Sequence, residues 1–219
     1  FNSTKRFLLF TGLDLQKRII GGQPCKPTER LYHVELTIRG NFPMFHCGGT
    51  LLKNQWILTA GHCWEKGGKI TAHLGVHPEI NKQSEQTIAR HEIFTDAQGN
   101  VHDIMLLKLP KPANIQPVPL PKQFCYSHLE LQRSDTLQCV DTTVVKCEPG
   151  FSDAHQHVFC GKRARVDACP GDSGSGVVYE GKIYGVISTG YCTNQGTQVE
   201  FMDVCNNDYI QWINQIIAT

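Results

Sequence analysis

The feature that most constrains this chain is its set of ten cysteines. They are even in number and spread along 219 residues, and no two have the Cys-x-x-Cys spacing typical of a zinc site. We therefore expect five disulfide bonds rather than a cysteine-bound metal. No other metal and no cofactor are expected. Because disulfides form and persist in oxidising compartments, a secreted or luminal protein is predicted.

A serine between glycines near the C-terminal end is the main candidate for chemistry. Ser173 lies in the stretch Gly-Asp-Ser-Gly, and glycines allow a tight turn that exposes the hydroxyl and leaves neighbouring N–H groups facing a substrate. A serine nucleophile needs a histidine base and a carboxylate that orients it. His62, in Thr-Ala-Gly-His-Cys, and Asp103, in His-Asp-Ile-Met-Leu, are the upstream candidates. A histidine beside a cysteine could also be structural or a metal ligand, but its motif favours the base.

These motifs follow one another as in the trypsin/chymotrypsin-type serine proteases, which the chain resembles in their zymogen form. The resemblance is carried by Arg18-Ile19-Ile20-Gly21-Gly22, Cys47-Gly48-Gly49, the stretch 55–63, Asp103-Ile104-Met105-Leu106, Gly171-Asp172-Ser173-Gly174 and the stretch 209–213. It implies that His62, Asp103 and Ser173 are the catalytic residues. It also implies an oxyanion hole built from the N–H groups of Gly171 and Ser173, and a Ser188 that supports Asp103.

Short alternating segments separated by Gly-, Asn- and Pro-containing turns predict an antiparallel all-β chain. By resemblance we expect a protease domain over 19–219, made of two six-stranded-type antiparallel Greek-key barrels and a C-terminal α-helix. The first barrel is placed at 31–109, a proline-rich linker at 110–121, and the second barrel with the helix at 122–219. Isoleucines at helical spacing predict the helix over 207–218.

The segment between Cys125 and Cys139 is shorter than in the family by about a strand and a loop. Either the second barrel is truncated there, or a mobile loop is absent from the sequence. The resemblance further implies five disulfide pairs: Cys25–Cys139, Cys47–Cys63, Cys125–Cys205, Cys147–Cys160 and Cys169–Cys192.

Residues 1–18 are predicted to be an activation peptide. They contain no cysteine, so cleavage after the dibasic Lys17-Arg18 would release them. The resemblance implies that the new amine of Ile19 then pairs with Asp172. Asn2, in Asn-Ser-Thr, is a glycosylation candidate, and the short motif favours neither the modified nor the unmodified asparagine.

Substrate preference is expected to depend on Asp167, which lies six residues before Ser173. In the family an aspartate there closes the primary pocket and selects Arg or Lys, since a buried carboxylate favours a cation. We also expect substrate-binding residues in the stretch Ser188-Thr189-Gly190. Two residues depart from the family pattern and argue against full trypsin-like activity. Val199 stands where the family usually has glycine, and Thr189 stands where it usually has an aromatic residue.

The net charge of +1 gives no electrostatic footprint for nucleic acid, and no apolar run approaches the roughly 18 residues of a membrane span. We therefore expect a secreted, monomeric serine endopeptidase zymogen that hydrolyses peptide bonds after Arg or Lys once cleaved after Arg18. Its partners would be protein or peptide substrates, an activating protease and protein inhibitors. The alternative is a protease-scaffold protein with little turnover that acts by binding, because Val199, Thr189 and the short 125–139 segment depart from the family pattern.

Overall fold

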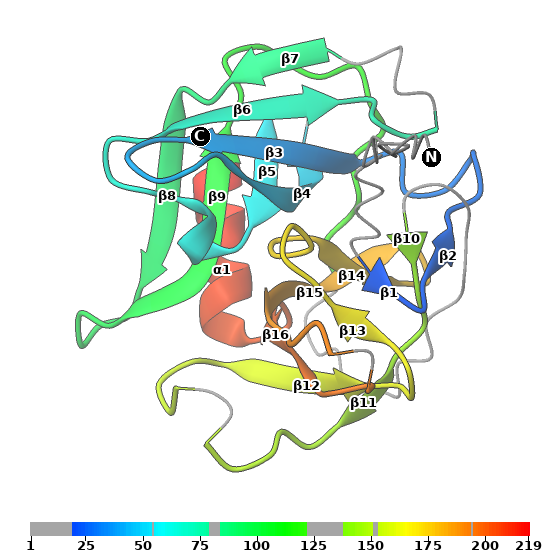
Figure 1. Cartoon of the computed structure of the whole chain (residues 1–219). Helices are drawn as coiled ribbons and strands as arrows, with labels where there is room; N and C mark the ends of the chain where they lie inside the picture. Colours follow the sequence, from blue (N-terminus) through cyan, green and yellow to red (C-terminus); the bar gives the residue numbers. More distant parts are fainter. Residues whose placement is uncertain (1–18, 54, 79–83, 122–137, 151–152, 194) are drawn as a thin grey trace, which may run out of the picture.

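Short strands of largely apolar residues account for most of the regular structure (Figure 1). The computed structural model describes residues 19–53, 55–78, 84–121, 138–150, 153–193 and 195–219. The predictions that concern residues 1–18, including Asn2 and Arg18, and the short segment before Cys139 therefore lie outside the described residues.

The first half forms one curled sheet of seven antiparallel strands in the order β7-β6-β3-β4-β5-β9-β8. Its strands are β3 (His33–Arg39), β4 (Phe45–Lys53), β5 (Trp56–Thr59), β6 (Lys69–Leu74), β7 (Ser84–Thr87), β8 (Arg90–Thr95) and β9 (Val101–Lys108). A single 3₁₀ turn, η1 (Gly61–Cys63), follows β5. β5 is buried at every position and is an interior strand, between β4 and β9.

The second half forms a five-stranded antiparallel sheet in the order β11-β12-β16-β15-β14 within the described residues. Its strands are β11 (Thr143–Val145), β12 (Val158–Lys162), β14 (Gly176–Tyr179), β15 (Lys182–Thr189) and β16 (Val199–Asp203). Two short pairs complete the strands: β1 (Ile19–Ile20) with β13 (Asp167–Ala168), and β2 (Gln23–Pro24) with β10 (Gln138–Cys139). The all-β prediction with two curled sheets is confirmed.

The predicted C-terminal helix is confirmed: it is α1 (Asn207–Ile217), the one α-helix among the described residues. The Asn206 side chain caps it by accepting a hydrogen bond from the N–H of Asp208, which satisfies one of the helix's free donors. Tyr209, Ile213 and Ile217 join the same core as the strands of the first sheet. No helix in the part of the chain described here is long and apolar enough to cross a membrane.

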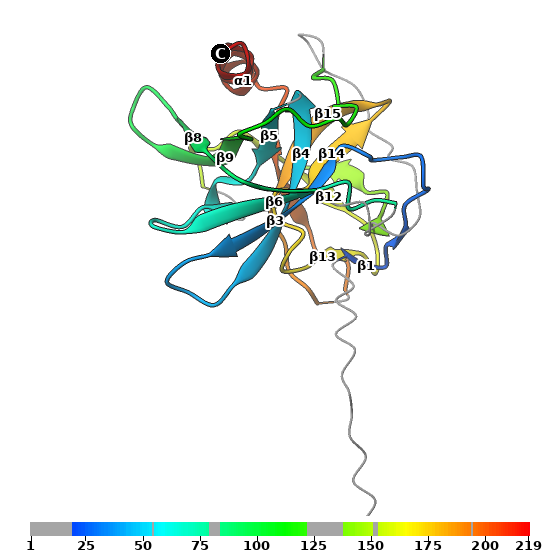
Figure 2. The same cartoon turned by 90° about the horizontal axis from the view of Figure 1, so that it is seen from above.

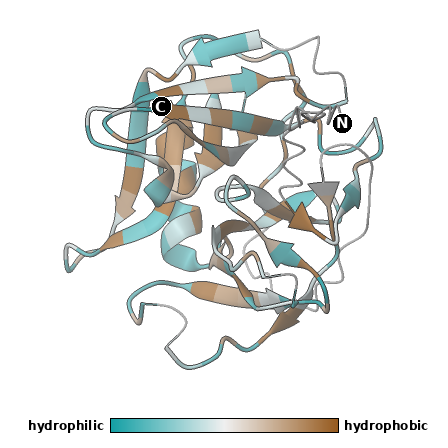
Figure 3. Ribbon diagram, viewed as in Figure 1, coloured by the Kyte–Doolittle hydropathy of each residue, from teal (hydrophilic) through white to brown (hydrophobic). Residues whose placement is uncertain are grey.

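The core is continuous between the two sheets, and brown, apolar positions line the facing strands (Figure 3). Each fully buried leucine or isoleucine, such as Ile57 or Leu106, stabilises the fold by about 1.5–3 kcal/mol. β4 lies beside β14, and β5 beside β15, so the sheets meet along a seam (Figure 2). One backbone hydrogen bond crosses the seam, from the Gly48 N–H to the Ser173 carbonyl at 2.7 Å, and the Gly174 N–H anchors the same loop to the Ile187 carbonyl of β15 at 2.8 Å.

Four of the implied disulfides are present: Cys25–Cys139, Cys47–Cys63, Cys147–Cys160 and Cys169–Cys192. The pair Cys125–Cys205 lies outside the described residues because Cys125 does. Bridges of this kind contribute about 2–4 kcal/mol each, mainly by restricting the unfolded chain. Two of them, Cys47–Cys63 and Cys169–Cys192, fasten loops that the sequence predicts to be functional.

Candidate active site

A chain of hydrogen bonds joins Ser188, Asp103 and His62 where the two sheets meet. The Ser188 hydroxyl donates to Asp103 Oδ2 at 2.6 Å, and His62 Nδ1 lies 2.9 Å from the same oxygen. The backbone N–H of His62 also donates to Asp103 Oδ1 at 2.7 Å. The carboxylate therefore fixes both the ring and the main chain of His62, leaving Nε2 as the ring nitrogen not bound to it.

Three different elements supply these groups. Asp103 lies on β9, His62 on the 3₁₀ turn that follows β5, and Ser188 on β15. β5 and β9 are neighbours in the first sheet, and the Cys47–Cys63 bridge ties the His62 turn to β4. The contact is therefore fixed by regular structure, with Ser188 arriving from the second sheet.

The electrostatics of the pair follow from this geometry. Burial would lower the pKa of His62, but the hydrogen bond and negative charge of Asp103 outweigh it, and the pKa is raised above 6.5. Burial would raise the pKa of Asp103, yet the hydrogen bond and charge of His62 and the Ser188 hydroxyl hold it below its usual range. Asp103 is thus ionised at neutral pH, and His62 is a stronger base than a free histidine.

The loop that carries Ser173 needs its glycines. Gly171 and Gly174 have φ of +100° and +82°, a region that side chains rarely adopt. A Cβ on Gly174 would also collide with the Thr59 hydroxyl and the Gly48 carbonyl. Among the described residues, no acceptor takes up the N–H groups of Gly171 and Ser173, so both donors remain for a substrate oxygen.

Ser173 and His62 face one cavity of about 860 Å³, whose lining also includes Asp103, Thr189 and Glu200. No hydrogen bond within 3.5 Å joins Ser173 to His62 in the described structure. Catalytic hydrogen bonds are often long without substrate and tighten in the complex, so this separation is compatible with a nucleophile and base pair.

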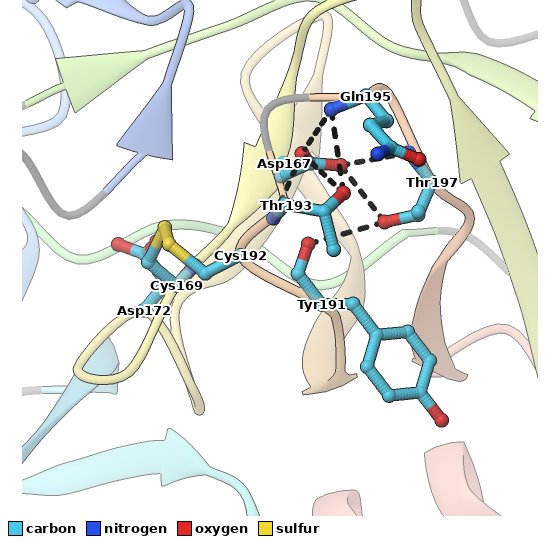
Figure 4. The surroundings of a disulfide bond; sticks show 8 residues. All are labelled: Asp167, Cys169, Asp172, Tyr191, Cys192, Thr193, Gln195 and Thr197. Atoms are coloured by element: carbon cyan, nitrogen blue, oxygen red, sulfur yellow. Dashed lines mark hydrogen bonds between the residues drawn. A yellow bond between two sulfur atoms is a disulfide. The ribbon is translucent and has the colours of Figure 1, made fainter.

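Asp167 lies elsewhere. It is completely buried, and its carboxylate accepts five hydrogen bonds from the loop that follows Cys192 (Figure 4). Oδ1 accepts from the N–H and hydroxyl of Thr197 at 2.7 and 2.8 Å, and Oδ2 from Thr193 and the N–H of Gln195. Burial would raise the pKa of Asp167, but the Thr197 and Thr193 donors outweigh it and lower the value. Asp167 is not part of the cavity lining.

Val199 is buried next to two residues that line the cavity, Ala168 and Gly190. It is buried against Ala168, and a Cβ built on Gly190 would lie 2.9 Å from Ala168 Cβ and 3.6 Å from Val199 Cγ1. Ala168, Gly190 and Val199 therefore lie close together, with little free space between them. Thr189 and Gly190 line the cavity itself, whereas Val199 does not.

Asp172 is part of the Ser173 loop, and Ile19 lies beside the strand that precedes it. Asp172 is buried, and its Oδ2 accepts a hydrogen bond from the N–H of Cys169 at 2.7 Å. Ile19 pairs with Ala168 in the β1–β13 ladder, so the chain just after Arg18 runs along the strand that leads into the Ser173 loop.

Two residues near the triad were not predicted from the sequence. The Gln156 side chain accepts a hydrogen bond from the N–H of Asp103 at 2.9 Å, and Glu200, which is 3% exposed, lies in the cavity wall. Gln156 gave no signal because it lies outside any periodic segment. Glu200 could have been noticed as an acidic residue inside the apolar strand Val-Glu-Phe-Met.

The one close group of potential metal ligands among the described residues is Cys47, His62 and Cys63. Because the two cysteines form a disulfide, neither offers a thiolate. The group therefore does not fit a metal ion.

Comparison with known proteins agrees with the geometry. The family model described as Trypsin matches residues 19–213. The chain is 31% identical to cationic trypsin-3 of Rattus norvegicus over 252 aligned positions, which cover 97% of each chain. It is 31% identical to trypsin of Sus scrofa, covering 94% of this chain and 98% of that one, and 30% identical to a trypsin of Xenopus laevis, covering 92% and 91%.

Proposed function

The chain belongs to the trypsin family of serine proteases, and from this premise we propose that it is an endopeptidase that cleaves after Arg or Lys. The observation that carries the proposal is the hydrogen-bonded chain from Ser188 through Asp103 to His62, which faces the same cavity as Ser173.

The proposed reaction has two stages. His62 Nε2 removes the proton of the Ser173 hydroxyl as the oxygen attacks the peptide carbonyl, and then gives this proton to the departing amine. A water, activated by His62, hydrolyses the acyl-enzyme and releases Ser173. Asp103 stabilises the imidazolium in both stages, and the N–H groups of Gly171 and Ser173 stabilise the oxyanion.

Preference for a cationic side chain is supported by the buried, ionised Asp167. Asp167 directly precedes Ala168, which lines the cavity together with Ser173, while Asp167 itself lies outside the lining. Because Val199 fills the approach, we propose a turnover on arginyl substrates well below that of a relative with an open pocket.

Val199→Gly is therefore expected to raise kcat/KM for an arginyl peptide. Removing the isopropyl group takes away the contact with Gly190 and opens the approach to Asp167. Val177→Ala is the matched control, because it shortens another valine of the same small cluster that does not line the cavity. An unchanged rate for Val199→Gly, or a rise of equal size in the control, would contradict this role of Val199.

We further propose a secreted zymogen, with residues 1–18 as the activation peptide and Asn2 as a glycosylation site. The disulfides support an oxidising compartment. In this proposal an activating protease cuts after Arg18, the Ile19 amine pairs with Asp172, and protein inhibitors are further partners of a monomeric enzyme.

Cleavage after Arg18 is expected to raise activity by about two orders of magnitude, the size of one well-placed oxyanion donor. The buried Asp172 gains a cation, which fixes the orientation of the Gly171 and Ser173 N–H groups. The measurement is titration with an active-site serine reagent before and after limited proteolysis. Arg18→Gln, which removes the cleavage site, is the control and should stay at the level of the uncut chain. Equal labelling of cut and uncut protein would refute the switch.

The same titration separates the enzyme from the alternative of a binding protein on a protease scaffold. The filled space between Ala168, Gly190 and Val199 favours that alternative. Rapid stoichiometric labelling of Ser173 in the cleaved protein would exclude it, whereas no labelling of a correctly cleaved and folded protein would support it.

A further inference from the structure

We propose that Glu200 is a specificity-determining residue that binds a second cationic side chain of the substrate, at a position other than the one directed toward Asp167. The inference rests on the proposed function, since it concerns which peptides the same site prefers. According to this proposal, the cavity binds peptides that carry two basic residues rather than one.

The alternation of strand β16 places Glu200 and Val199 on opposite faces. Val199 packs toward Ala168 and Gly190, on the filled side. Glu200 is paired with Thr189 across the β15–β16 ladder and lies in the lining of the cavity that contains Ser173. Its cross-strand neighbour Thr189 has a short side chain and lines the same cavity.

The charge of the cavity supports a cationic ligand. Its lining includes three carboxylates, Asp103, Asp153 and Glu200, and contains neither lysine nor arginine. Asp103 accepts hydrogen bonds from His62 and Ser188, and Asp153 is exposed to solvent. Glu200 is the acidic group held within the wall, where low exposure to water strengthens its attraction for a cation.

The two buried carboxylates of this region therefore differ in what they face. Asp167 lies outside the cavity lining and accepts five hydrogen bonds from the 193–197 loop. Glu200 lies in the lining itself. A substrate cation in the cavity would therefore approach the wall that holds Glu200, on the face of β16 opposite Val199.

Apolar groups beside the cavity fit the remainder of a lysine or arginine. Ile93 and Val101 are part of the lining, and Val101 is 60% exposed. The methylene stem of a basic side chain can pack on such groups while its charged end reaches a carboxylate. This combination favours a long cationic side chain over a short polar one.

The test uses peptides that keep arginine before the scissile bond and carry either lysine or norleucine at one flanking position at a time. Norleucine has the stem of lysine without its charge. In the wild type we expect one position at which lysine raises kcat/KM by about tenfold or more over norleucine, the effect of a charged hydrogen bond. In Glu200→Gln this ratio should fall to near one, and in Glu200→Asp it should be partly retained.

Glu180→Gln is the matched control, because it removes one negative charge from an exposed turn outside the cavity and should keep the wild-type ratio. A wild-type ratio near one at every position overturns the proposal without any variant. A ratio that survives in Glu200→Gln overturns it as well.

Binding of the same peptides to Ser173→Ala, followed by calorimetry, needs no turnover. The lysine preference should appear there even if the chain proves to have little peptidase activity. Loss of turnover with retained preference therefore refutes the proposed function alone, and loss of the preference in both assays refutes the role of Glu200.

Discussion

Ser173→Ala is expected to lower kcat by about six orders of magnitude, the size of effect seen when a serine protease loses its nucleophile. The substitution removes the one hydroxyl that lies on the glycine-bounded loop and faces the cavity with His62. It leaves the N–H groups of residues 171 and 173 in place, so peptide binding should be largely kept. The measurement is single-turnover acylation of the cleaved protein, with binding followed separately.

Ser175→Ala is the control for this prediction. Ser175 is on the same loop, but its side chain is directed toward Gly48 and it is not part of the cavity lining. A normal burst of acylation is expected. Cleavage by Ser173→Ala at the wild-type rate would show that a different nucleophile acts in this chain.

The hydrogen-bonded arrangement of His62, Asp103 and Ser188 was predictable because each residue lies within a motif that also determines its local structure. His62 follows the fully buried strand β5 and precedes a cysteine that is bridged to β4, so its place beside β9 follows from the sheet and the disulfide. Ser188 could be assigned by resemblance, and its hydroxyl indeed donates to Asp103. The helix over 207–217 was visible from its spaced isoleucines.

The surroundings of the cavity could not be predicted in this way. Sequence motifs place Asp167 near Ser173 along the chain, but they do not show that the donors of Thr193, Gln195 and Thr197 converge on its carboxylate. This depends on the path of the loop after Cys192. Similarly, the position of Glu200 in the cavity wall depends on the β15–β16 register, which includes an irregularity between Ile187 and Thr189. Register and loop path are properties of the packed structure.

The pH dependence of activity is a second consequence of the triad. Because Asp103 raises the pKa of His62 above 6.5, kcat/KM should rise as the pH passes through that raised value. Below it, His62 is protonated and cannot accept the proton of Ser173. In a plot of kcat/KM against pH, activity is therefore lost on the acidic side, as the pH falls below the pKa of His62.

Asp103→Asn is expected to lower kcat by about four orders of magnitude, because an amide can hold the imidazole in the wrong tautomer and offers no charge to the imidazolium. It also removes the carboxylate that outweighs burial at His62, so the acidic limb should move to lower pH. The measurement is kcat/KM as a function of pH for the cleaved wild type and the variant.

Ser188→Ala is the control: it removes one hydrogen-bond donor to Asp103 while keeping the charge of the carboxylate. Its loss of kcat should be far smaller, and its acidic limb should stay near that of the wild type. An Asp103→Asn enzyme with the wild-type rate, or with its acidic limb moved to higher pH, would show that Asp103 does not control the basicity of His62.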